Sequence, residues 1–170
     1  MDELDRQSLQ KIRMAIGRTV TGLSCFEWET REPSSFNEKG PSLLETYWPV
    51  RIHFDDSKCL QFYSEVSNTV RLTVEEVEET YPPTVAVGGT VASVRAAIGE
   101  VSLLEVKDTP WAAGFVLDHG QFLGVALGET AFGDTIDFIP DSFVVISDRR
   151  IATSYSADGS PDGAWGQELH

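Results

Sequence analysis

The residue types that most often perform chemistry in proteins are scarce in this chain and poorly grouped. Histidine occurs three times: His170 is the last residue, His119 falls in a predicted turn, and His53 lies close to Asp55 and Asp56. These aspartates fall at the tip of a predicted hairpin, and the sequence has no Cys-x-x-Cys, His-x-His or Asp-x-Asp-x-Asp-Gly spacing. We therefore expect no metal site and no cofactor, with His53 an exposed histidine beside a polar turn.

Nucleophilic catalysis has no sequence signature either. The chain lacks the Gly-x-Ser-x-Gly turn of many serine hydrolases, and neither Cys25 nor Cys59 is adjacent to a histidine. A catalytic triad is assembled in space rather than in sequence, so any Ser-His or Cys-His arrangement would depend on His53. The sequence predicts that the protein is not an enzyme.

One segment is distinguished by its charge. Between Ala96 and Asp148 the chain has nine acidic residues and a single basic one, Lys107, and aromatic residues are interleaved with the acids. Acidic groups beside aromatic rings suit a surface that binds lysine and arginine side chains, with the rings as anchors and cation–π acceptors. An evenly solvated rim, with the aromatic residues in the core, is the alternative. The residues predicted to contact a partner are Trp111, Asp118, Glu129, Phe132, Asp134, Asp137 and Asp141.

The whole chain is acidic as well, with 27 acids against 13 lysines and arginines and a formal net charge of −14. Such a surface repels phosphate backbones and anionic lipid, so we expect neither nucleic acid nor a membrane as the partner. It accelerates the encounter with a basic protein by electrostatic steering. A contribution to solubility alone is the alternative reading of the charge.

Nothing in the sequence predicts export or membrane insertion. The segment Met1–Asp5 is acidic and has no apolar stretch of the kind found in signal peptides, and the longest apolar run is Phe143–Ile146. Cys25 and Cys59 fall in apolar, strand-like stretches and do not form a disulfide framework. We expect a cytoplasmic protein with two buried, reduced cysteines.

The elements that must position these residues begin with a helix. Residues 3–16 carry apolar side chains at helical spacing, and Gly17 follows where the helix would end. Residues 46–74 then alternate apolar and polar side chains in three short runs separated by polar turns, which is typical of an antiparallel meander with one buried and one wet face.

Residues 91–98 fit two structures, either a short helix that begins after Thr90 and ends at Gly99 or part of a strand, and we favour the helix. Further strands are predicted over 100–107, 113–118, 121–127, 135–139 and 143–147, with a tight turn at 118–121. Residues 153–170 are rich in Ser, Gly and Asp, which predicts a flexible tail. The alternative is that Trp165 docks onto the domain.

The predicted fold class is α+β and mostly β: an N-terminal helix packed on a curved antiparallel sheet or partly open barrel. We expect residues 1–152 to form a single acidic domain, followed by the flexible tail over 153–170. In size, charge and lack of catalytic motifs the chain is similar to the small acidic proteins with which bacteria neutralise basic toxins. That likeness implies an immunity or antitoxin-type inhibitor of a basic effector such as a nuclease. A small-ligand-binding barrel or minor enzyme with a pocket at the mouth of the sheet is the alternative.

Overall fold

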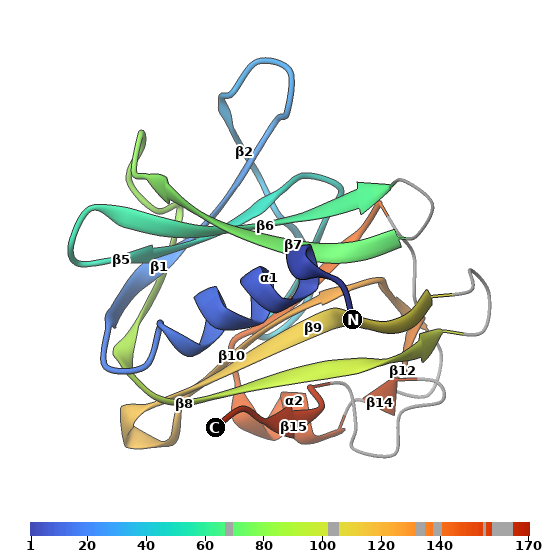
Figure 1. The fold of residues 1–170 in the computed structure, drawn as a ribbon. Helices are drawn as coiled ribbons and strands as arrows, with labels where there is room; N and C mark the ends of the chain where they lie inside the picture. Colours follow the sequence, from blue (N-terminus) through green and yellow to red (C-terminus); the bar gives the residue numbers. More distant parts are fainter. Residues whose placement is uncertain (67–69, 102–105, 132–134, 138–140, 155, 158–164) are drawn as a thin grey trace.

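The chain folds into strands that form one large antiparallel sheet, with a helix packed against it (Figure 1). The computed structural model describes residues 1–66, 70–101, 106–131, 135–137, 141–154, 156–157 and 165–170. The strands are β1 (Thr19–Phe26), β2 (Pro33–Ser34), β3 (Asn37–Gly40), β4 (Leu43–Thr46), β5 (Val50–Phe54), β6 (Lys58–Val66), β7 (Val70–Glu78), β8 (Val85–Val101), β9 (Val106–Leu117), β10 (Phe122–Leu127), β11 (Glu129–Ala131), β12 (Thr135–Asp137), β13 (Phe143–Ile146), β14 (Ser156–Ala157) and β15 (Gln167–Glu168). The helices are α1 (Glu3–Arg13), α2 (Arg149–Ser154) and the short 3-10 turn η1 (Asp118–Gly120).

The large sheet is curved because one long strand belongs to both of its halves. The strand order is β3-β4-β13-β10-β9-β8-β1-β5-β6-β7, with β2 paired to β1 and β15 paired to β8. Residues 85–90 of β8 pair with β1, whereas residues 91–101 pair with β9. The two end strands, β3 and β7, do not pair with each other, so the sheet is not closed. This architecture confirms the predicted fold class; β11, β12 and β14 form a separate small sheet.

Helix α1 lies between the two halves of the sheet and covers the exposed edge of β7 (Figure 1). Its buried residues include Leu9 and Ile12, which belong to the hydrophobic core. The Ser8 hydroxyl accepts a hydrogen bond from the Val74 amide at 3.1 Å, and Lys11 Nζ donates to the Val74 carbonyl at 3.2 Å. The helix therefore occupies backbone groups of an edge strand that would otherwise be open to pairing with another chain.

The predicted meander is confirmed, but the predicted helix over 91–98 is wrong. Strands β5, β6 and β7 pair antiparallel in sequence order. Residues 91–98 lie within β8, because neighbouring strands satisfy their backbone groups on both sides and Val94 is buried in the core. Pairing within the sheet overrides the local signal for a helix here.

The end of the chain is also ordered where the structure describes it. Trp165 is buried, its indole N–H donates to the Ala152 carbonyl at 3.1 Å, and its ring packs edge-on against Phe122. A Cβ at Gly124 would lie 2.4 Å from the Trp165 ring, so only glycine admits the indole there. Docking of Trp165, the alternative considered for the predicted tail, is thus what the structure has for this residue; residues 155 and 158–164 lie outside the described part.

Cys25 and Cys59 are both free, and both are buried, as the sequence predicts. No helix in the described residues has the length and apolar character needed to cross a membrane.

Candidate functional site

The acids predicted to contact a partner do not form one patch. Glu129 and Asp141 are exposed and flank the same end of the antiparallel β10–β13 pair, where the Gly128 amide donates a hydrogen bond to the Ser142 carbonyl. Asp118 lies at the other end of β10, about 20 Å away for a strand of this length. Its carboxylate accepts a hydrogen bond from the Thr90 amide at 2.8 Å.

The other predicted contact residues are placed less favourably for binding. Trp111 is only 4% exposed and belongs to the core, so its ring is not presented to a partner. Asp137 lies in β12 opposite Glu129, although its side chain falls outside the description. Phe132 and Asp134 lie outside the described residues.

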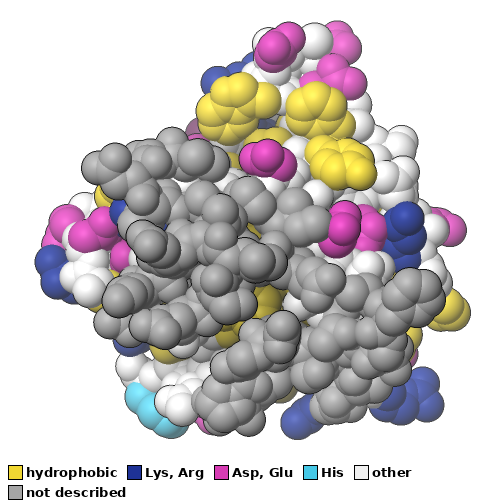
Figure 2. Space-filling view, turned by 90° about the vertical axis from the view of Figure 1, so that its right-hand side faces the viewer, with side chains coloured by type: hydrophobic (Ala, Val, Ile, Leu, Met, Phe, Trp, Pro, Cys, Tyr) yellow, Lys and Arg dark blue, Asp and Glu magenta, His cyan; other side chains and the backbone are white. Residues whose placement is uncertain are grey.

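Asp141 lies instead beside aromatic residues that are far from it in sequence. It lines a surface groove of about 260 Å³, and most of the side chains around it carry rings. The lining residues, which we call the aromatic groove, are Trp28, Tyr47, Trp48, Pro49, Tyr63, Ser64, Asp141 and Phe143. Figure 2 shows hydrophobic side chains gathered near the top of one face, with acidic side chains beside them.

Three local features of the chain expose these rings. Trp28 follows the end of β1 and is 47% exposed, while Tyr47 lies in the bend between β4 and β5 and is 68% exposed. The Thr46 hydroxyl fixes that bend by accepting a hydrogen bond from the Trp48 amide at 3.1 Å. Tyr63 projects from β6, and its ring centroid lies 5.9 Å from that of Trp28.

Charged side chains lie close to the rings of the groove. Burial raises the pKa of Tyr63, and the nearby carboxylates of Glu75 and Glu65 raise it further. The guanidinium of Arg31 already lies over the Trp28 ring, 4.8 Å from its centroid. Aromatic faces and carboxylates around one groove favour a cation, such as the side chain of a lysine or arginine.

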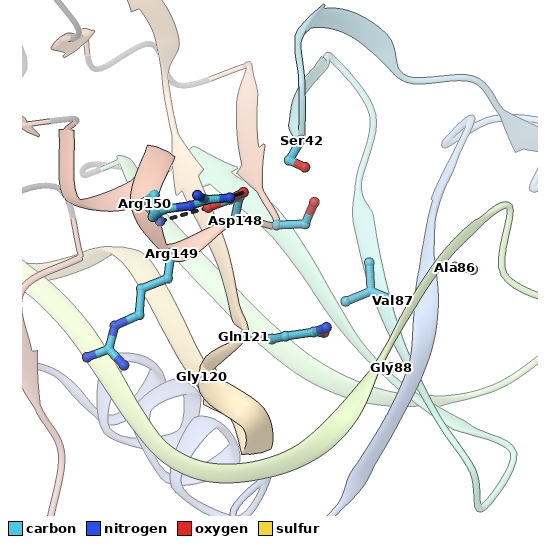
Figure 3. Close-up of a pocket in the computed structure, with 10 residues that line it drawn as sticks. Ser42, Ala86, Val87, Gly88, Gly120, Gln121, Asp148, Arg149 and Arg150 are labelled. Carbon is cyan, nitrogen blue, oxygen red and sulfur yellow. Dashed lines mark hydrogen bonds and ion pairs between the residues drawn. The ribbon is translucent and has the colours of Figure 1, made fainter.

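A second hollow, the open cavity, lies between β8 and the paired strands β10 and β13, at the start of β10 and the end of β13. It measures about 1010 Å³ and is lined by Ser42, Ala86–Gly88, Gly120, Gln121, Ser147 and Asp148–Arg150. Figure 3 shows Gln121 and Val87 pointing into this space, while Arg149 points away from them. The lining includes one carboxylate, that of Asp148, which is paired with Arg150 at 3.8 Å. The cavity can bind through hydrogen bonds but presents no acid–base pair of its own among these side chains.

A third feature lies on the face of β1, β5 and β6 that points away from the hydrophobic core. It consists of Ser24, Arg51, His53, Cys59 and Gln61, and we call it the buried polar cluster. Three strands separate β7 from β8 in the sheet, so the connection between them must cross β6, β5 and β1. It passes directly over Gly22, where an added Cβ would lie 2.6 Å from Pro83. We call residues 79–84 the strap. The strap covers the polar face of these strands, so their polar side chains are buried. The alternation of apolar and polar residues in the sequence predicts instead that this face is exposed to solvent.

His53 is at the centre of this cluster and is fully buried, so the prediction of an exposed histidine is wrong. Its Nε2 lies 2.6 Å from the Ser24 hydroxyl, and its Nδ1 lies 2.8 Å from Oε2 of Glu79. Burial lowers the pKa of His53 against the opposing effect of its hydrogen bond to Glu79, so the neutral ring is favoured. Because a carboxylate only accepts, Nδ1–H donates to Glu79 and Nε2 accepts from Ser24.

This order of serine, histidine and carboxylate is that of a hydrolase triad, but Ser24 is inaccessible. Its side chain is fully buried, and neither the aromatic groove nor the open cavity is lined by Ser24 or His53. The adjacent Arg51 is also buried; it donates to Gln61 at 2.8 Å and to Thr80 of the strap at 3.0 Å. In this conformation the cluster joins the strap to the sheet.

The chain matches no protein-family model, no curated protein and no solved structure. The three sites differ in the side chains that they offer to a ligand or partner. Of these, the aromatic groove combines exposed rings, a carboxylate and access from solvent.

Sequence reasoning missed both the rings of the groove and the partners of His53. Trp28 and Tyr47 fall outside the acidic segment between residues 96 and 148, and they meet Asp141 only through the folding of the sheet. Ser24 and Glu79 are 29 and 26 residues away from His53. The available signal was the polar character of alternate positions in β1, β5 and β6, which also suits an exposed face.

Proposed function

We propose that this chain is a non-catalytic binding protein, an immunity or antitoxin-type inhibitor that presents an acidic surface to a basic effector such as a toxin nuclease. The single observation that carries the proposal is the exposure of Trp28 and Tyr47 in one groove with Asp141. Exposed tryptophan and tyrosine beside a carboxylate are the residues that most often anchor a partner's arginine or lysine.

The charge of the molecule supports the same partner. At a formal −14, long-range attraction speeds the approach of a cationic protein, and this attraction is screened as salt increases. A nuclease has a cationic surface for phosphate, so an acidic inhibitor is complementary to it. The proposed division of labour is that distributed acids set the association rate, while the ring-lined groove sets the lifetime of the complex.

A photo-crosslinking experiment in the native host tests the proposal. In one strain, benzoylphenylalanine replaces Tyr47 in the groove. In the control strain it replaces Met14, which is 61% exposed and follows the last residue of α1. Met14 does not line the groove. We expect Tyr47 to capture a basic protein that Met14 does not capture.

The purified partner then permits a direct measurement. Trp28→Ala should weaken binding about 30-fold, equivalent to the ~2 kcal/mol of a central anchor, mainly through faster dissociation. Asp141→Asn should slow association more than Glu78→Gln, an exposed acid of β7 that does not line the groove. An acidic partner, binding that is indifferent to salt, or equal capture from Met14 would contradict the proposal.

A second candidate function rests on the open cavity, whose volume of about 1010 Å³ would hold a small ligand. The hydroxyls of Ser42 and Ser147 and the amide of Gln121 would supply its polar contacts. A ligand screen by NMR on the wild type and on Val87→Trp, which fills the cavity, tests this candidate. Compounds that bind only the wild type and shift resonances of Gln121 would favour it over the inhibitor.

A further inference from the structure

Three metal-binding side chains from different elements meet in the buried polar cluster. His53 is in β5, Cys59 in β6 and Glu79 begins the strap, and their ligand atoms all lie within 4.8 Å of one another. Nδ1 of His53 lies 3.4 Å from Sγ of Cys59 and 2.8 Å from Oε2 of Glu79. We propose that these three residues form a binding site for Zn²⁺ or a divalent ion of the same class.

Two of the three ligand separations are close to those around a tetrahedral ion, and the third, between Sγ of Cys59 and the Glu79 carboxylate, is at most 4.8 Å. Ideal bonds of about 2.3 Å to sulfur and about 2.0–2.1 Å to nitrogen and oxygen place neighbouring ligands roughly 3.3–3.6 Å apart. The Sγ–Nδ1 separation already has this value, and the Nδ1–Oε2 separation has to open by about 0.5 Å. His53 and Cys59 are directly opposite in the β5–β6 ladder, so the sheet fixes two of the three ligands.

Ser24 supplies the contact that holds the histidine in the ligating orientation. Metal-bound histidines usually donate their second ring N–H to an oxygen acceptor, which fixes the tautomer. When Nδ1 binds the ion, Nε2 carries the proton, and this N–H donates a hydrogen bond to the Ser24 hydroxyl oxygen, which lies 2.6 Å away. The hydroxyl needs only to rotate, since it can donate or accept.

The donor set selects the class of ion. One thiolate, one imidazole and one carboxylate suit Zn²⁺, whereas Mg²⁺ and Ca²⁺ prefer oxygen ligands throughout. The Glu79 side chain is 25% exposed, so a water molecule can approach from that side to complete four-fold coordination. Arg51 keeps its positive charge, because its partners Gln61 and Thr80 are neutral, and this charge opposes a cation. The negative charges of a Cys59 thiolate and the Glu79 carboxylate act in the other direction.

The site differs from the prediction that the chain has no metal ligands at a recognisable spacing. That prediction considered neighbours in sequence, and Glu79 is brought to His53 only by the crossing of the strap. The competing interpretation is a buried hydrogen-bond cluster that never binds an ion. The two interpretations predict different spectra with cobalt.

The experiment is a titration of the metal-free, full-length protein with Co²⁺, followed by Zn²⁺. We expect one equivalent of Co²⁺ to produce visible ligand-field bands and a near-ultraviolet thiolate-to-cobalt band, and Zn²⁺ to abolish both. His53→Gln and Glu79→Gln should each weaken binding at least 10-fold, and Cys59→Ser should remove the thiolate band. Ser24→Ala should weaken binding about 10-fold or more while leaving the thiolate band in place.

Cys25 provides the matched control, because it is the other cysteine, equally buried, but on the core face of β1. Cys25→Ser should retain the thiolate band, which assigns the band to Cys59 even if Cys59→Ser does not fold. The absence of a thiolate band in the wild type at equimolar Co²⁺ would overturn the proposal. So would a band that persists in Cys59→Ser or disappears in folded Cys25→Ser.

Discussion

The Ser24 hydroxyl oxygen lies 2.6 Å from Nε2 of His53, and both side chains are fully buried. With Glu79 bonded to Nδ1, both nitrogens of a buried imidazole have partners. The strap supplies Glu79 and covers the ring, so the hydrogen bond between His53 and Glu79 requires the strap to lie across the sheet.

Replacing His53 should therefore destabilise the protein. In His53→Gln the side-chain amide cannot reach both Ser24 and Glu79 in the same geometry, which leaves a buried polar group unpaired. The expected loss in the free energy of unfolding is about 1–3 kcal/mol, measured by urea denaturation. His119→Gln is the control, because the His119 side chain is 88% exposed, and it should change stability by less than about 0.5 kcal/mol. Equal stability of wild type and His53→Gln would mean that the ring is not held as described.

Trp165 should contribute strongly to stability. Trp165→Ala removes a buried indole that packs on Phe122, and should cost about 3–5 kcal/mol, or roughly 6–20 °C in Tm. Trp28→Ala removes an exposed ring and should cost about 1 kcal/mol or less. Thermal unfolding followed by circular dichroism measures both variants. A tail that is free in solution would instead make Trp165→Ala the milder of the two.

The link between α1 and the edge strand can be tested at a single amide. Ser8→Ala leaves the Val74 N–H without its acceptor, at a cost of about 1–2 kcal/mol, and hydrogen exchange at Val74 should accelerate. Gln10→Ala changes an exposed residue of the same helix and should leave that exchange rate unchanged. Similar protection of Val74 in both variants would contradict the assigned hydrogen bond.

The start of α1 should give stability a defined pH dependence. Asp2 caps the helix by accepting from the Asp5 amide and pairs with Arg71; the Arg71 hydrogen bond is the main cause that lowers its pKa from 3.8 to about 2. Because the folded state favours the carboxylate, this contribution is complete above pH 3.8 and is lost as pH falls towards 2. Asp2→Asn should thus be destabilising at pH 7 and progressively less so between pH ~4 and ~2.5.

Asp5 provides the contrast with the opposite sign. Its side chain is buried, and burial raises its pKa above 3.8 against the attraction of Arg71. The folded state therefore favours protonated Asp5, so this residue's contribution to stability grows as pH falls through its raised pKa. Urea denaturation across the pH range should show the Asp2→Asn and Asp5→Asn differences changing in opposite directions. Parallel changes would disprove the assigned environments.

The sequence predicts α1 and the β5–β7 meander because each is specified by its own side-chain period. It does not predict that both faces of β5 are buried, since the second face is covered by a strap whose path depends on the order of all the strands. The same limit applies to the aromatic groove, where Asp141 is recognised from local charge but Tyr47 is not. The predicted helix over residues 91–98 is wrong because Thr90 and Gly99 are residue types that often begin and end a helix, whereas here they lie within β8.

The position of α1 against β7 has a consequence during synthesis. The Val74 amide that bonds Ser8 is made 66 residues later, which takes roughly 3–13 s at about 5–20 residues per second. During that interval Leu9 and Ile12 have no β7 to pack on, although they are buried in the finished protein. Chaperones that bind short apolar stretches should therefore engage the growing chain at α1, and release should follow once the β5–β7 meander has left the ribosome.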